Sequence, residues 1–222
     1  MKKNGFTLAE VLITLAIIGV VATLTLPALM NNTQEQQFKT ALKKGLNTLT
    51  TIAETNNALE NWDFTGVATA SDVSNTEASG HTSLYAMMAT RGSVDYALSG
   101  PGTMPASGST GTSGNFAVFF RDGSVLMFPA DTLGNDKADE AKKQSDGLAY
   151  GIRAVFDVNG KKLPNLLSNC SGETAMSSED PTSDAGKTCD KANRVIKDRF
   201  GIRLRERYAV PNGAAARWAY EN

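Results

Sequence analysis

Hydrophobic residues are concentrated at the start of the chain. The segment from Val11 to Met30 is almost entirely apolar and contains no charged residue. A helix of this length rises by about 1.5 Å per residue and spans roughly 30 Å, which is the thickness of the hydrocarbon core of a bilayer. The pattern therefore predicts one membrane-spanning helix near the N-terminus.

A second apolar pattern follows this segment. Its positions recur at steps of three and four, the spacing of one stripe along a helix. They are Phe38, Ala41, Leu42, Leu46, Leu49, Ile52 and Ala53. We expect the helix to continue to about Leu59 and to dock by this stripe on a sheet of the same chain, with a partner helix as the alternative.

Beyond residue 61 the apolar runs are short and are separated by turn residues. Five runs predict strands: 116–120, 124–128, 152–158, 202–210 and 214–220. The first two flank Asp122-Gly123, which is a hairpin signal. Together they predict an α+β fold, in which the helix packs on an antiparallel sheet of three to five strands. The polar stretch 99–115 predicts a surface loop, and 136–144 a short helix.

Composition and charge narrow the function classes. The chain has 22 Lys and Arg against 23 Asp and Glu, so a broad basic surface for nucleic acid is not expected. One histidine, His81, and two cysteines without CxxC spacing exclude a multi-histidine metal site and a four-cysteine zinc site. No nucleophile-elbow, HExxH or phosphate-loop motif is present, which disfavours an enzyme.

The C-terminal region is basic. Its basic residues are Arg194, Lys197, Arg199, Arg203, Arg205 and Arg207. A solvated face, or salt bridges to an acidic loop, is the favoured interpretation. Binding of DNA or of another anionic surface is the alternative.

Glu10 is a carboxylate at the very start of the apolar run. A charge in a membrane segment is costly, so it indicates a functional site whose partner should be named. The apolar run that follows Glu10 contains no cation, so we expect the partner to come from another chain. A secretory signal peptide fits poorly, because no small-x-small cleavage site ends the run. A simple anchor leaves Glu10 unexplained.

The opening residues carry a recognisable motif. The stretch Gly5-Phe6-Thr7-Leu8-Ala9-Glu10, followed by the apolar run, resembles the prepilin cleavage and methylation motif of type IV pilins and type II secretion pseudopilins. The resemblance implies that a prepilin peptidase cuts between Gly5 and Phe6 and methylates the new amine of Phe6. Glu10 would then pair with the N-terminal amine of a neighbouring Phe6 during filament assembly.

The resemblance also implies a fold, a function and partners. The fold is pilin-like, and the chain divides into a leader (1–5), a transmembrane helix (6–30), an amphipathic continuation (31–60) and a globular α+β head with flexible loops (61–222). The function is that of a structural subunit in a type II secretion pseudopilus, favoured by the hairpin and the DxNG segment of the head. A type IV pilus subunit, or a minor tip pilin with an adhesin or DNA-binding role, is the alternative.

The implied partners are the prepilin peptidase, other pilin or pseudopilin subunits, membrane lipids and an inner-membrane assembly platform; no nucleic acid is expected. Lys2 and Lys3 precede the apolar run. The positive-inside rule therefore places the N-terminus in the cytoplasm and the head outside. We expect a single-pass protein of the cytoplasmic (inner) membrane that enters an extracytoplasmic filament.

Gly19 and Pro27 interrupt the apolar run. Relative to alanine, glycine weakens a helix by about 1 kcal/mol and interior proline by about 3 kcal/mol. We expect a bend or a loosened stretch between them. The alternative is a slight bend, with Thr25 and neighbouring helices satisfying the backbone.

Two further features lie in the head. Cys170 and Cys189 could form a disulfide outside the cytoplasm, stabilising the fold by about 3 kcal/mol. Asp157 and Asn159 look like the start of a calcium loop, but Lys161 and Lys162 stand where further acidic ligands are expected. A turn is therefore the favoured interpretation and calcium a minor alternative; no other metal or cofactor is expected.

Overall fold

The computed structural model describes residues 5, 7–67, 83–100, 115–129, 152–160, 162–170 and 194–222. Its contacts divide the chain into two units, Met1–Gln37 and Phe38–Asn222. The long helix α1 (Leu8–Glu60) contributes to both units. Its end agrees with the helix end that the sequence predicts near residue 59.

In the first unit, α1 contains one stretch, Leu8–Thr25, that is long and apolar enough to cross a membrane. Its threonine hydroxyls are satisfied within the helix. Thr14 donates to the carbonyl of Val11 at 2.9 Å and Thr25 to that of Val21 at 3.0 Å. These bonds remove the cost of placing hydroxyl groups in an apolar medium.

The sequence predicts a bend or a loosened stretch between Gly19 and Pro27, but the structure has no break in the helix there. The α-helix continues through both Gly19 and Pro27 within its bounds of Leu8–Glu60. A bend at these two residues stays a prediction.

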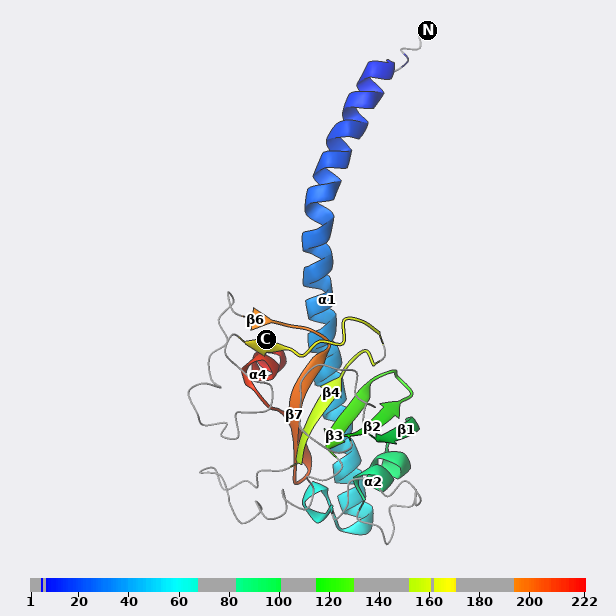
Figure 1. Cartoon of the computed structure of the whole chain (residues 1–222), viewed down its shortest axis with the longest axis vertical. Coiled ribbons are helices and arrows are strands. Elements are labelled where there is room, and N and C mark those ends of the chain that lie inside the picture. Colours follow the sequence, from blue (N-terminus) through cyan, green and yellow to red (C-terminus); the bar gives the residue numbers. More distant parts are fainter. Residues whose placement is uncertain are drawn as a thin grey trace. The chain divides into compact units, whose positions relative to one another are not determined.

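The second unit is built on an antiparallel sheet with the order β1-β2-β3-β4-β7-β8 (Figure 1). Its strands are β1 (Val94–Gly100), β2 (Asn115–Phe120), β3 (Val125–Pro129), β4 (Ile152–Asp157), β7 (Arg199–Arg205) and β8 (Tyr208–Pro211). A separate two-stranded sheet pairs β5 (Asn169–Cys170) with β6 (Arg194–Val195). The helical elements are η1 (Phe64–Gly66), α2 (Leu84–Arg91) and α4 (Ala214–Glu221). The chain thus has the predicted α+β, pilin-like fold.

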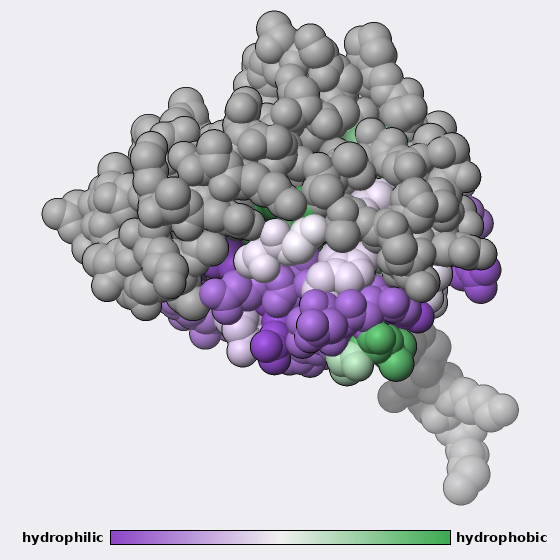
Figure 2. Space-filling view, turned by 90° about the horizontal axis from the view of Figure 1, so that it is seen from below, coloured by the Kyte–Doolittle hydropathy of each residue, from purple (hydrophilic) through white to green (hydrophobic). Residues whose placement is uncertain are grey.

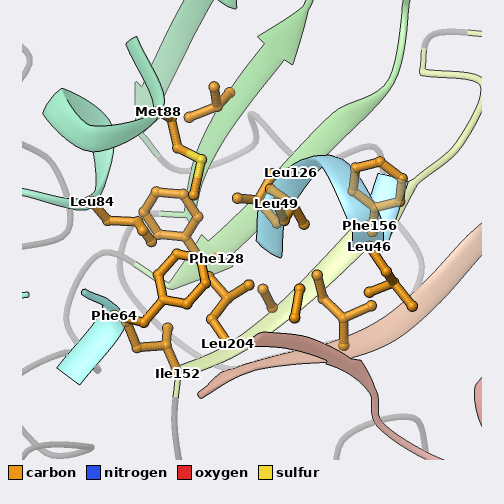
Figure 3. Close-up of a cluster of buried hydrophobic side chains, with 14 of the residues drawn as sticks. Leu46, Leu49, Phe64, Leu84, Met88, Leu126, Phe128, Ile152, Phe156 and Leu204 are labelled. Carbon is orange, nitrogen blue, oxygen red and sulfur yellow. The ribbon is translucent and has the colours of Figure 1, made fainter. Parts of the chain in front are cut away.

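The apolar stripe of α1 docks on this sheet, as the sequence predicts. Leu46 and Leu49 are buried against Leu126 and Phe156 of the sheet (Figure 3). Gly45 permits the close approach, because a Cβ at this position would overlap the ring of Phe156. Burying apolar surface between helix and sheet supplies the main stabilisation of this unit.

The predicted hairpin is present as β2 and β3, with Phe119 opposite Val125. The Asp122 carboxylate accepts hydrogen bonds from the backbone N–H and the hydroxyl of Ser124, at 3.0 and 2.6 Å. Gly123 has φ +90°, a conformation that glycine adopts without strain. The side-chain hydrogen bonds of Asp122 and the positive φ of Gly123 therefore stabilise the turn that the Asp-Gly pair predicts.

Three predictions about the head need correction. Residues 214–220 form helix α4 and not a strand, because the run of alanines that opens it favours a helix and buries its small side chains. The run 202–210 divides between β7 and β8. The described residues contain six strands in the main sheet, since β1 was not predicted. His81, most of the 99–115 loop and the 136–144 helix lie outside the described residues.

Candidate functional site

Thr7 and Glu10 form hydrogen bonds with each other at the first turn of α1. The backbone N–H of Thr7 donates to Oε2 of Glu10 at 2.8 Å, and the Thr7 hydroxyl donates to the same oxygen at 2.9 Å. In return, Oγ1 of Thr7 accepts the backbone N–H of Glu10 at 3.3 Å. This reciprocal arrangement is a capping box, with Thr7 as the N-cap of the helix.

The capping box gives Glu10 a role that the sequence analysis missed. The first N–H groups of any helix lack partners within the helix, and the box supplies partners at this end. The carboxylate also lies where the helix dipole favours negative charge. The expectation that Glu10 finds its partner in another chain is therefore incomplete. The signal was present in the sequence as Thr-x-x-Glu before an apolar run.

The predicted cleavage site lies just outside the capping box. Gly5 is exposed, and nothing lies within 4 Å of the position that a Cβ would take there. Phe6 lies outside the described residues. Since the bond from Gly5 to Phe6 precedes Thr7, a chain that begins at Phe6 would keep the whole box.

One oxygen of the Glu10 carboxylate takes both bonds from Thr7. Both described hydrogen bonds to this carboxylate end on Oε2. A carboxylate has acceptor capacity on each oxygen. Within the described contacts, Oε1 is therefore open to a further donor, such as an ammonium group.

The calcium-loop candidates form a turn fastened to β7. Asp157 is almost fully buried, and its carboxylate accepts the backbone N–H groups of Asn159 and Gly160 at 3.1 and 2.8 Å. Its other oxygen accepts Nε–H of Arg199 at 2.9 Å. Burial raises the pKa of Asp157, while the hydrogen bond from Arg199 opposes the rise. The described residues hold no group of three His, Cys, Asp or Glu placed to bind a metal ion.

Cys170 lies in the small sheet at the C-terminal side of the head. It is buried, disulfide-bonded and paired in register with Arg194 of β6. Cys189 lies outside the described residues, so its pairing with Cys170 stays a prediction.

Two cations lie close to the indole ring of Trp218 in α4. The Lys39 ammonium lies 3.8 Å from the ring centroid and the Arg194 guanidinium carbon 3.2 Å from it. We name Lys39, Trp218 and Arg194 the tryptophan clamp. It joins α1, α4 and β6, which no sequence spacing could indicate.

The basic C-terminal region is a solvated face only in part. Arg199, Arg203 and Arg205 are buried within β7, which lies between β4 and β8 in the sheet. Arg207 is exposed, and its Nε lies 3.8 Å from Oδ2 of Asp63. A solvated face is therefore wrong for the β7 arginines, and Arg199 instead pairs with Asp157 inside the head.

Comparison with known proteins identifies the N-terminal segment. Residues 1–26 match the family described as "Prokaryotic N-terminal methylation motif". No curated protein and no solved structure matches the chain. The match confirms the resemblance to prepilin-type cleavage and methylation proteins and supports a type IV pilin-like or pseudopilin protein. Proteins of this kind are structural subunits.

Proposed function

We propose that this chain is a structural subunit of a type II secretion pseudopilus, held in the inner membrane by the first part of α1 before it enters the filament. The observation that carries the proposal is the capped Glu10 at the start of a membrane-length helix, inside a matching methylation motif. A carboxylate kept in this position by its own helix is available to an ammonium group from another subunit.

Processing by the prepilin peptidase is the first step. Cleavage after Gly5 creates a new ammonium group at Phe6, and methylation modifies it. In hydrocarbon, that ammonium and the Glu10 carboxylate are each costly alone, and they satisfy each other when paired. Pairing between neighbouring subunits therefore favours assembly and fixes the axial register of the filament.

The orientation of the chain across the inner membrane follows from the charge near its N-terminus and from the polarity of its head. Lys2 and Lys3 favour a cytoplasmic N-terminus, which leaves the head outside the inner membrane. The described residues on the face of the head in Figure 2 are mostly hydrophilic, as expected for a surface in water. The inner-membrane assembly platform and other pilin or pseudopilin subunits are the implied partners.

The choice of a pseudopilus rests on the head. Its hairpin of β2 and β3 and the turn at Asp157 are the features that favour it. A type IV pilus subunit is the alternative. Deletion of the gene separates the two: a pseudopilus subunit is needed for release of secreted proteins and not for surface fibres, and a pilus subunit has the reverse requirement.

The test of processing is the intact mass of the protein from membranes, with a tandem spectrum of its N-terminus. We expect a chain that begins at methylated Phe6. A chain that still begins at Met1, in cells with an active prepilin peptidase, would contradict the proposal.

The test of assembly is the substitution Glu10→Ala. It should abolish incorporation into filaments while membrane insertion is retained. The matched control is Glu54→Ala, which removes an exposed glutamate from the later part of the same helix. Equal assembly of the two variants would show that Glu10 has no role in the filament.

A further inference from the structure

The exposed apolar side chains of the head are unevenly distributed. Among the described residues of the second unit, six large apolar side chains are exposed, and four of the six lie on three segments that pack together. These four are Leu163, Leu166, Val195 and Tyr220. A single exposed leucine is ordinary on a protein surface, but a group of exposed apolar side chains is a candidate contact surface. We name these four side chains, with Lys162 and Lys197 beside them, the basal patch.

Buried contacts hold the three segments of the basal patch in place. Helix α4 packs on the small sheet of β5 and β6 through a buried cluster that contains Cys170 and Ala214. The loop before β5 is fastened by the fully buried Asp198, whose carboxylate accepts the backbone N–H groups of Asn165 and Leu166 at 2.7 and 2.9 Å. The folded head therefore presents the patch on preorganised backbone, which lowers the entropy lost on docking.

The basal patch lies where α1 enters this unit. The tryptophan clamp shows this, because Lys39 is the second residue of the unit and its ammonium lies 3.8 Å from the ring centroid of Trp218. Arg194 of β6 contacts the same ring. Figure 1 shows β6, α4 and the C-terminus together at this end of the unit. The patch is therefore on the part of the head that is nearest along the helix to the apolar run.

The chain between the apolar run and the head is short. The run ends at Met30, and the unit that carries the head begins at Phe38. These residues belong to α1, so the helical rise from Met30 to Phe38 is about 12 Å, at about 1.5 Å per residue. The polar head-group layer outside the hydrocarbon core of a bilayer is about 5–8 Å thick on each side. A bilayer that holds the apolar run is therefore within reach of the start of the head.

The chemistry of the basal patch fits the surface of a bilayer. Its three segments carry four cations among the described residues, which are Lys162, Arg194, Lys197 and Arg217. Two anions, Glu221 and the C-terminal carboxylate, offset half of this charge and leave it positive. Exposed leucine and valine beside lysine, with tryptophan and tyrosine, is the composition of surfaces that bind at the interface of a membrane. A positive surface of this kind is complementary to anionic lipid head groups.

We propose that the basal patch docks on the anionic lipid surface of the membrane that holds α1. Leu163, Leu166 and Val195 enter the head-group region, and the lysines contact lipid phosphates. The inference rests on the proposed function only for the anchor in the membrane. Docking holds the head against the bilayer before assembly, so leaving the lipid surface becomes part of the cost of entering the filament.

The two tryptophans of the chain make a direct test possible. The full-length chain is reconstituted in vesicles that contain a phosphatidylcholine with a nitroxide on its head group, which quenches the fluorescence of a nearby indole. The variant Trp62→Phe reports on Trp218, beside the basal patch. The matched control, Trp218→Phe, reports on Trp62, which follows the end of α1 at Glu60. The helix rises by about 32 Å from Lys39 to Glu60, so Trp62 lies at the far end of the unit.

We expect the quenching of Trp218 to depend on the charge of the lipid. It should be stronger in vesicles that contain phosphatidylglycerol than in vesicles of phosphatidylcholine alone, and the difference should disappear at high salt, which screens exposed charges. Trp62 should be quenched weakly in both. Equal quenching of Trp218 in the two kinds of vesicle would overturn the inference. Shielding of Trp218 that grows with the ratio of protein to lipid would also overturn it, because the patch would then bind a second copy.

Substitutions within the patch test its charge, in the background that keeps Trp218 alone. Lys162→Gln should lower the ratio of docked to undocked heads about fivefold in phosphatidylglycerol vesicles. The matched control is Arg207→Gln, which removes an exposed cation near Asp63, at the far end of the unit. The same quenching in these two variants would refute a role for the charge of the patch.

A second pair of variants tests the apolar part. Leu163→Ser should reduce the quenching of Trp218 in both kinds of vesicle and keep the unfolding midpoint of the parent, because this side chain is 83% exposed. Leu59→Ser is the matched control, since Leu59 is 64% exposed and lies at the far end of α1. Equal quenching in Leu163→Ser and Leu59→Ser would show that the leucine does not enter the lipid surface.

Flotation of the same vesicles separates this inference from the proposed function. A chain that floats with the vesicles, without the effect of phosphatidylglycerol on Trp218, would leave the membrane anchor standing and refute the docking. A chain that does not float with them would refute the anchor and the docking together.

Discussion

Asp157 and Arg199 form an ion pair inside the head, with Nε of the arginine 2.9 Å from Oδ2 of the aspartate and at most 3% of either side chain exposed. They face each other in register on β4 and β7. The pair lies at the end of β4, and the Asp157 carboxylate also accepts the backbone N–H of Gly160 in the turn that follows. A buried charge that keeps its partner is tolerated, and one that loses it is costly.

Removal of one partner should therefore destabilise the head strongly. Asp157→Asn leaves the Arg199 charge buried without its carboxylate and should lower the free energy of unfolding by about 3–5 kcal/mol. Chemical unfolding of the full chain in detergent micelles measures the change. The matched control is Asp122→Asn, which breaks the exposed pair with Lys44 and should cost about 1 kcal/mol or less. Similar losses in the two variants would contradict the assignment of Asp157 as a structural charge.

The Asp122 side chain should make a small contribution to stability that depends on pH. Burial raises the pKa of Asp122, but the hydrogen bonds from Ser124 and the contact with Lys44 outweigh it and leave the pKa below the usual value of 3.8. An acid whose pKa is lowered by folding stabilises the fold above its unfolded pKa, and this stabilisation is lost as the pH falls through the folded pKa. Unfolding curves measured at a series of acidic pH values should show that the free energy of unfolding falls less steeply with decreasing pH for Asp122→Asn than for the parent. A steeper loss in the variant would refute the assignment.

Sequence reasoning predicted the features that local rules determine. The apolar run after Glu10, the stripe from Phe38 to Ala53 and the Asp122-Gly123 turn each depend on neighbours in the sequence, and all three are present. Contacts between distant segments were not accessible in this way. Lys39, Arg194 and Trp218 meet only after the chain has folded, and nothing in their spacing indicates it.

Two errors have physical causes. The segment 214–220, which follows the Pro211-Asn212-Gly213 turn signal, is predicted as a short strand, although its alanines favour a helix. The β7 arginines were interpreted as a charged surface because arginine is seldom buried. Their position on an inner strand of the sheet overrides that preference.

The tryptophan clamp should contribute measurably to the stability of the head. Trp218→Leu keeps an apolar side chain but removes the π face that Lys39 and Arg194 contact, and each such contact contributes about 0.5–2 kcal/mol. Lys39→Met tests one side alone, because it keeps the aliphatic stem and removes the charge. Chemical unfolding in detergent should show a larger decrease in the free energy of unfolding for Trp218→Leu than for Lys39→Met. The clamp would be refuted if Lys39→Met were as stable as the parent.

Gly45 should resist substitution although it lies in a helix. Alanine normally stabilises a helix relative to glycine by about 1 kcal/mol. At position 45 the added Cβ would overlap the ring of Phe156, and such overpacking costs typically about 1–3 kcal/mol. We therefore expect Gly45→Ala to lower the unfolding midpoint. Gly19→Ala is the control on the same helix, since nothing lies within 4 Å of its Cβ position. A midpoint of Gly45→Ala at or above that of the parent would show that α1 does not approach the sheet this closely.

Thr7 should hold the start of α1 in its helical form. Thr7→Ala removes the hydroxyl that accepts the Glu10 N–H and should destabilise the first turn by about 0.5–2 kcal/mol. Hydrogen exchange in detergent micelles measures this locally, as faster exchange of the amides from Leu8 to Glu10 with no change at Leu46 or Leu49. Thr7→Ser keeps the hydroxyl and should exchange at the rate of the parent. Equal exchange in Thr7→Ala and Thr7→Ser would mean that the hydroxyl does not cap the helix, and that the Glu10 carboxylate is positioned by other groups.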